Sequence, residues 1–185
     1  MLRRGSCNAD QPCPILASDS GNTNGIDRSF EGRAVSAALC NNIAAVTFVS
    51  KHKAVCQPIA DQLELPVENI LGLAAQESQY GSGRIARELN NYFSMHAPAP
   101  LQIGSEAPMG NARIQVAKYS SFQQCAQSFA TRYGAAVRGK KDPLEFAQTL
   151  VKIGFNTGNA ATGGRDGFAK YLAQIIIAVK GRMAC

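Results

Sequence analysis

The chain has 185 residues, enough to bury one hydrophobic core, and we expect a single domain. Hydrophobic residues make up 45% and charged residues 17%, which is typical of globular proteins, and no apolar run is long enough to cross a membrane. The net charge of +6 is spread over several segments. Since no recognition-helix signature and no interleaving of aromatic and basic residues accompanies it, we expect no nucleic-acid partner.

Residues 1–32 are rich in Asn, Asp, Ser, Gly and Pro and show no periodicity, which predicts an irregular arm before a domain over 33–185. The start of the chain is basic but lacks the apolar segment of a secretory signal. We therefore expect delivery by a route that does not read such a signal, either an injection machine or release through a phage holin.

The six cysteines form no CxxC pair and accompany only two histidines, which argues against a zinc site, and we expect no cofactor. Two or three disulfides formed in an oxidising compartment are favoured over buried thiols in a cytosolic protein. Many pairings are possible. The shortest loops favour Cys7–Cys13 and Cys40–Cys56, which leaves Cys125 with Cys185.

Apolar spacing predicts a helix from Ala34 to about Ser50 and a second over Ala54–Leu63, with Pro58 in its first turn or at a kink. Pro66 suits the first position of a third helix.

The third helix carries the most informative feature of the chain. Ile70, Leu73, Ala74 and Glu77 are three or four residues apart, so Glu77 continues a buried stripe, and a glycine-rich turn at 81–83 follows. A carboxyl group on an apolar face tends to stay protonated near neutral pH and can then donate a proton. The alternative is a structural glutamate bound to backbone amides.

The later elements are predicted in the same way. Residues 84–91 should form a short helix, and alternation around Ile114 and Val116 indicates one strand of a small hairpin. Helical spacing returns over Phe122–Tyr133, over Pro143–Gly154 and from Phe168 to Val179. These elements predict a mainly helical α+β domain.

Several blocks resemble the glucosaminidases of glycoside hydrolase family 73, in the right order over residues 48–180. The resemblance implies a lysozyme-like fold with a small β-hairpin lobe, and cleavage of the β-1,4 bond after N-acetylglucosamine in peptidoglycan. The blocks that carry it are Leu65-Pro66 through Ala75-Gln76-Glu77-Ser78, Glu88–Met95, Tyr119-Ser120-Ser121-Phe122 and Gly167–Ile175.

The resemblance implies that Glu77 is the catalytic general acid. It places a second carboxylate in the β lobe, where Glu106 is the acidic residue between Asn91 and Tyr119. If Glu106 enters the cleft across a large gap, it would activate a water in an inverting reaction. If Glu106 is instead a solvated loop charge, the acetamido group of the substrate would serve as the nucleophile.

Five further residues are expected to bind substrate, and Asn90 or Asn91 should also hold the turn beneath Glu77. The alternative for Tyr92 is that its ring packs in the hydrophobic core instead of binding substrate. The chain departs from the family pattern at Ser94, where glycine is usual, and near Phe155 and at Phe168, where tyrosine is usual. The expected substrate-binding residues are Asn90, Asn91, Tyr92, Ser78 and Tyr80.

These features favour a monomeric antibacterial effector of a type VI secretion system that acts on peptidoglycan in the periplasm of a target bacterium. An immunity protein that blocks the cleft is the expected partner. A phage endolysin is the delivery alternative. A lytic transglycosylase is less favoured because no Gly-Leu-Met-Gln-like element follows the glutamate, and an inert wall-binding protein is less favoured because Glu77 is intact.

Overall fold

The computed structural model describes residues 37–108, 113–156 and 160–185. The expected irregular arm, with Cys7 and Cys13, lies outside these residues. The elements in chain order are α2 (Ile43–Leu63), α3 (Val67–Glu77), α4 (Arg84–Leu89), β1 (Gly104–Glu106), β2 (Val116–Lys118), α5 (Phe122–Val137), α6 (Pro143–Lys152), the 3-10 helix η1 (Ala160–Thr162) and α7 (Gly164–Arg182).

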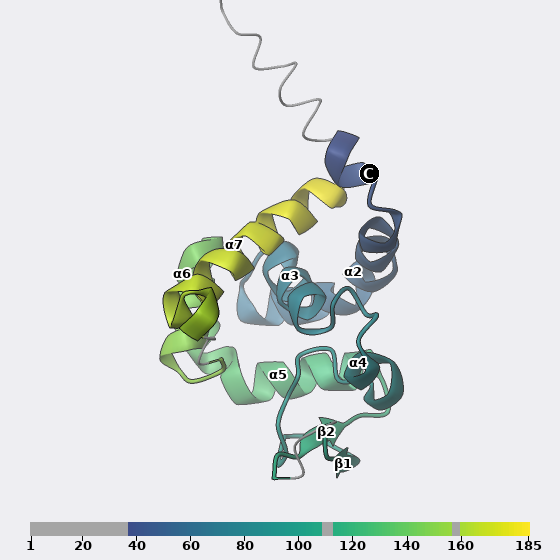
Figure 1. Cartoon of the computed structure of the whole chain (residues 1–185), viewed down its shortest axis with the longest axis vertical. Coiled ribbons are helices and arrows are strands. Elements are labelled where there is room, and N and C mark those ends of the chain that lie inside the picture. The colour runs from purple at the N-terminus through teal and green to yellow at the C-terminus, as the bar shows by residue number, and fades with distance from the viewer. Residues whose placement is uncertain (1–36, 109–112, 157–159) are drawn as a thin grey trace, which may run out of the picture.

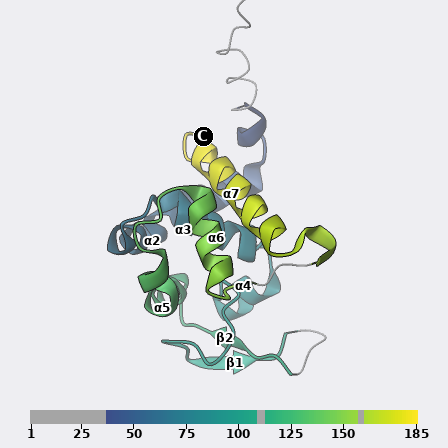
Figure 2. The same ribbon diagram turned by 90° about the vertical axis from the view of Figure 1, so that its left-hand side faces the viewer.

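Helix α3 lies in the middle of the molecule and packs against α2 on one side and α7 on the other (Figure 1). The antiparallel hairpin of β1 and β2 lies at the end opposite the C-terminus, as the turned view also shows (Figure 2). The predicted fold class, a mainly helical α+β domain with a small β lobe, is confirmed. Among the described helices, none combines the length and apolar character needed to span a membrane.

Helix α2 is one continuous helix, so the predicted division into two helices is wrong. The predicted gap between the two helices, residues 51–53, contains His52, which is buried beside Phe48, with their ring centroids 4.7 Å apart. Burial lowers the pKa of His52 to about 4, so the imidazole is neutral and belongs to the core face. Pro58 lies inside the helix.

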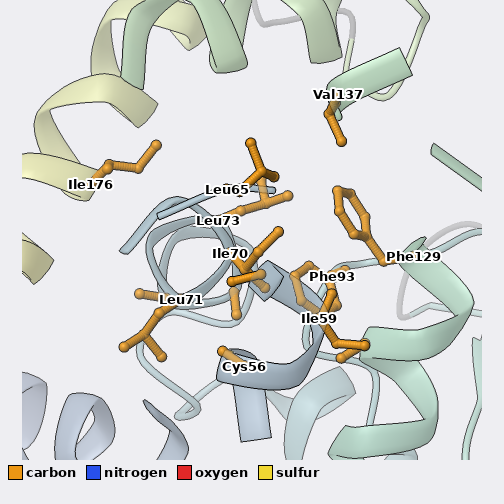
Figure 3. Close-up of a cluster of buried hydrophobic side chains, with 14 of the residues drawn as sticks. Cys56, Ile59, Leu65, Ile70, Leu71, Leu73, Phe93, Phe129, Val137 and Ile176 are labelled. Carbon is orange, nitrogen blue, oxygen red and sulfur yellow. The ribbon is translucent and has the colours of Figure 1, made fainter. Parts of the chain in front are cut away.

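Helix α3 is buried around its whole circumference, rather than along the single stripe that its spacing predicts. Every residue from Val67 to Ala75 is buried. Gly72 allows α7 to approach closely, because a Cβ there would lie 2.9 Å from the Cα of Ile176. The side chains around α3 form one hydrophobic core, part of which Figure 3 shows.

The remaining elements agree with the sequence in type and differ mainly in their ends. Asp142 and Ser121 accept backbone N–H groups with their side chains and so begin α6 and α5. In the hairpin, Glu106 pairs with Val116 and Gly104 with Lys118.

The disulfide pairing differs from the prediction. Cys40 is bonded to Cys185, whereas Cys56 and Cys125 are buried free thiols. The pairings Cys40–Cys56 and Cys125–Cys185 are therefore wrong. Both free cysteines lie on core faces of their helices, and burial raises the pKa of each thiol to about 12.

We expect the Cys40→Ala/Cys185→Ala double variant to lose about 2–5 kcal/mol of unfolding free energy, because the disulfide closes most of the described chain into one loop. Urea unfolding under oxidising conditions would measure this. A reducing agent should destabilise the parent protein and leave the double variant unchanged. Equal stability of the oxidised and reduced parent would contradict the prediction.

Candidate active site

A cleft of about 430 Å³ opens at the C-terminal end of α3. Glu77, the last residue of α3, lines it together with Phe93. One wall comes from the segment after α4 and the other from the segment after α6, so the cleft joins parts of the chain that are distant in sequence. The lining residues are Glu77, Phe93, Ser94, His96, Gly154, Phe155 and Asn156.

Glu77 has the environment of a proton donor. Burial raises the pKa of its carboxyl group from the ordinary 4.5 to about 7, and hydrogen bonds from the side chains of Ser94 and Asn156 act in the opposite direction. Burial has the larger effect. Near neutral pH a substantial fraction of Glu77 is therefore protonated while it still faces an open cleft, as a general acid requires.

The turn after Glu77 is built around Ser78. The buried Ser78 hydroxyl donates to the carbonyl of Ala74 at 2.6 Å and accepts the N–H of Gly81 at 2.8 Å. Gln79 and Tyr80 have left-handed backbones, with φ of 52° and 54°, so the helix ends before the predicted glycine turn, whose first residue Gly81 is also left-handed with φ of 76°. The structure thus places Ser78 beneath the site, away from the cleft lining.

Asn90 and Asn91 hold the segment that forms one wall. The fully buried Asn91 donates to the carbonyls of Met95 and Ala117 at 2.9 and 2.8 Å, and accepts the N–H of Met95 at 2.9 Å. Asn90 donates to the carbonyl of Tyr119 at 3.0 Å. In the segment fixed by Asn91, Ser94 donates to the backbone carbonyl of Glu77 at 3.1 Å. These amides bond Met95, Ala117 and Tyr119 rather than the turn after Glu77, so the expected support of that turn by an asparagine stays a prediction, and neither amide lines the cleft.

Glu106 does not line the cleft that contains Glu77. It lies at the end of β1, where its carboxylate is 3.4 Å from Lys118 Nζ and 4.0 Å from an Arg84 guanidinium nitrogen. Its side chain is 43% exposed. These features match the alternative left open by the sequence, in which Glu106 is a solvated loop charge.

The two tyrosines expected at the substrate lie in an aromatic cluster outside the cleft lining. The Tyr92 ring stacks on Phe122 at a centroid distance of 4.2 Å. The Tyr80 ring meets Phe48 edge-on at 5.7 Å, and its hydroxyl accepts a hydrogen bond from Arg182 at 2.8 Å. The core alternative for Tyr92 therefore fits the structure, and Tyr80 links the turn after Glu77 to α7.

His96 and Asn156 line the cleft, although the sequence did not single them out as site residues. His96 is exposed, and its carbonyl accepts a hydrogen bond from Arg132 at 3.1 Å. Ser94 and Phe155 also line the cleft, and both stand at positions where the sequence departs from the family pattern. That departure is the signal by which the sequence could have marked them as cleft residues. Phe155 puts a ring without a hydroxyl in the cleft, whereas Phe168 is buried outside the lining.

An acid kept protonated by burial, at the edge of an open cleft, is the arrangement with which glycoside hydrolases protonate a leaving oxygen. A family model, Glucosaminidase, described as mannosyl-glycoprotein endo-beta-N-acetylglucosaminidase, matches residues 53–180. The chain therefore belongs to the glucosaminidase family and is a glycoside hydrolase.

Solved structures support the same fold. The chain is 75% identical to one in a type VI secretion system effector–immunity complex from Pseudomonas protegens, with a TM-score of 0.73, over 80% of this chain and 99% of that one. A peptidoglycan hydrolase from Sphingomonas sp. A1 has 22% identity and a TM-score of 0.62, over 75% of this chain and 93% of the other. A C-terminally truncated glycoside hydrolase domain of Salmonella typhimurium FlgJ has 23% identity and a TM-score of 0.53, over 74% and 97%. The sequence matched no curated protein.

We expect Glu77→Gln to stabilise the protein in a pH-dependent way. Because folding raises the pKa of Glu77 from 4.5 to about 7, the stability of the parent falls as the pH rises between these values. The variant should gain up to about 3 kcal/mol above pH 7 and little below pH 4.5. Urea unfolding across this pH range would measure the difference.

Glu88→Gln provides the control, because Glu88 is an exposed partner of Arg84 and such pairs contribute little. It should show no comparable pH slope. If the stability difference between Glu77→Gln and the parent does not change with pH, burial does not raise the pKa of the Glu77 carboxyl group, and the prediction is contradicted.

Proposed function

We propose that the protein hydrolyses the β-1,4 bond after N-acetylglucosamine in peptidoglycan, with Glu77 as the general acid. The observation that carries this proposal is the raised pKa of Glu77 in a cleft at the end of the core helix. Membership of the glucosaminidase family supports the bond type, and the fold is shared with peptidoglycan hydrolases. The protonated carboxyl would donate its proton to the leaving glycosidic oxygen, so the rate should fall as the pH rises above 7.

The second half of the reaction needs a group that either attacks the anomeric carbon itself or activates a water molecule to attack it. Among the described residues that line the cleft, Glu77 is the only carboxylate. Glu106 is held in ion pairs by Lys118 and Arg84 outside that lining. This arrangement favours the acetamido group of the substrate as the nucleophile over water activation by Glu106.

The biological setting that we propose is that of an antibacterial effector delivered by a type VI secretion system. A chain 75% identical to this one was solved in an effector–immunity complex. We propose a similar immunity partner, which would cover the Glu77 cleft, and action as a monomer in the periplasm of a target bacterium. The Cys40–Cys185 disulfide suits that oxidising compartment.

We expect Glu77→Gln to lower the rate of peptidoglycan digestion by about 10²–10⁴-fold, because glutamine cannot donate the proton. Mass spectrometry of digested sacculi should show reducing N-acetylglucosamine ends from the parent protein. Anhydromuramic ends would instead identify a lytic transglycosylase, and full activity in the variant would overturn the role of Glu77.

The matched change Glu106→Gln tests the second carboxylate in the same assay. If the substrate supplies the nucleophile, the rate should stay within a few-fold of the parent. A loss as large as that of Glu77→Gln would make Glu106 part of the catalytic machinery.

Expression in a Gram-negative host tests the effector role. The parent chain exported to the periplasm should lyse the cells, whereas the same chain kept in the cytoplasm should not. Exported Glu77→Gln should be harmless. Equal toxicity of the exported variant would show that killing does not depend on hydrolysis.

A further inference from the structure

We propose that Ser94 and Asn156 are positioning residues that hold the Glu77 carboxyl group from two separate segments of the cleft lining and stabilise the carboxylate left after proton donation. This inference rests on the proposed role of Glu77 as the acid. All three side chains line the same cleft, the Ser94 hydroxyl bonds the backbone carbonyl of Glu77, and both Ser94 and Asn156 are close enough to the Glu77 carboxyl group to lower its pKa.

Ser94 occupies a backbone conformation that serine adopts at a cost. Its φ is 48°, in the left-handed region where glycine is free of strain. The segment keeps this conformation because Asn91 fixes both the N–H and the carbonyl of Met95. The hydroxyl donates its single proton to the Glu77 backbone carbonyl at 3.1 Å, and because a hydroxyl rotates, it can turn that proton to the adjacent carboxyl group once the acid is ionised. A side chain kept at a strained position, aimed at the reacting residue, is better explained by function than by the fold.

Asn156 approaches from the other wall, after α6. The residue before it, Phe155, is anchored by edge-on contact with Tyr133 at 5.2 Å and by its N–H, which donates to the carbonyl of Leu150 at 3.0 Å. This anchoring presents the Asn156 amide to Glu77 without bringing a charge into the cleft. Both donors are neutral, so they can favour the ionised carboxylate while burial still keeps the acid protonated near neutral pH.

Several charged groups on neighbouring elements have partners other than Glu77. On α7, Lys180 pairs with Glu68 at 3.2 Å and Arg182 with the Tyr80 hydroxyl, while in the hairpin Lys118 pairs with Glu106. On α2, His52 is buried and neutral. Apart from Glu77, His96 is the titratable group among the described lining residues, and it is exposed. The two neutral donors are therefore the groups best placed to adjust Glu77.

The test is the pH profile of kcat/KM on purified sacculi for Ser94→Gly and Asn156→Ala. Glycine removes the hydroxyl and relaxes the left-handed backbone, so a change in activity would not report new strain. Removing either donor raises the pKa of Glu77, so the alkaline limb of the profile should move up by roughly 0.5–1 pH unit, with a lower plateau. The double variant should move it further.

Ser105→Gly is the matched control, because Ser105 is an exposed serine on β1 outside the cleft, and its profile should coincide with that of the parent. Reduced activity with an unmoved alkaline limb in both Ser94→Gly and Asn156→Ala would overturn the inference and leave a structural role. Glu77→Gln separates the two claims. If Glu77→Gln remains active, the proposed function fails. If it is inactive but the alkaline limbs of the Ser94→Gly and Asn156→Ala profiles do not move, only the positioning role fails.

Discussion

The removal of the Glu77 carboxyl group from water is the constraint on which the site depends. Helix α3 is enclosed by its neighbours from Val67 to Ala75, so its last residue is where the core first meets the cleft. A carboxylate at that boundary is poorly solvated, which raises its pKa to about 7 and makes it a useful acid near neutral pH. The close crossing at Gly72 and Ile176 keeps α7 tight against α3 and so maintains this burial.

The cleft is formed by two separately anchored walls. Asn91 ties one wall to β2 through a hydrogen bond to the carbonyl of Ala117 and fixes Met95 within that wall through two more. Arg132 on α5 binds the carbonyls of His96 and Pro98 in the same wall. The other wall is fixed by the packing of Phe155 on the aromatic rings of α5. Because each wall has its own buried support, the groups around Glu77 are held in place before substrate arrives, which limits the reorganisation that proton transfer needs.

The sequence predicted the features that arise from local patterns. The spacing of apolar residues placed Glu77 at the end of a buried helix, and the ends of α4, α5 and α6 were close to those observed. The division of α2 was wrong because the predicted gap falls at His52, which is neutral and packed against Phe48, so the core face of the helix continues through it. The cysteine pairing was wrong because loop length does not say which side chains face the core.

The polar surroundings of Glu77 were harder to predict, because they depend on contacts between distant segments. Asn156 has no periodic pattern around it and meets Glu77 only through the packing of α6. Tyr92 and Phe93 are adjacent in sequence, yet Phe93 lines the cleft while Tyr92 stacks on Phe122 outside its lining. A motif identifies such a block as important and leaves open which of its side chains faces the substrate.

A carbon-13 NMR titration of the glutamate side-chain carboxyls would test the central claim most directly. The Glu77 resonance would be assigned by its absence in Glu77→Gln. A titration midpoint near pH 7, well above that of the exposed glutamates, is the result expected from burial at the end of α3. A midpoint near the ordinary 4.5 would show that Glu77 is ionised at neutral pH, and would contradict the role of proton donor that we propose for it.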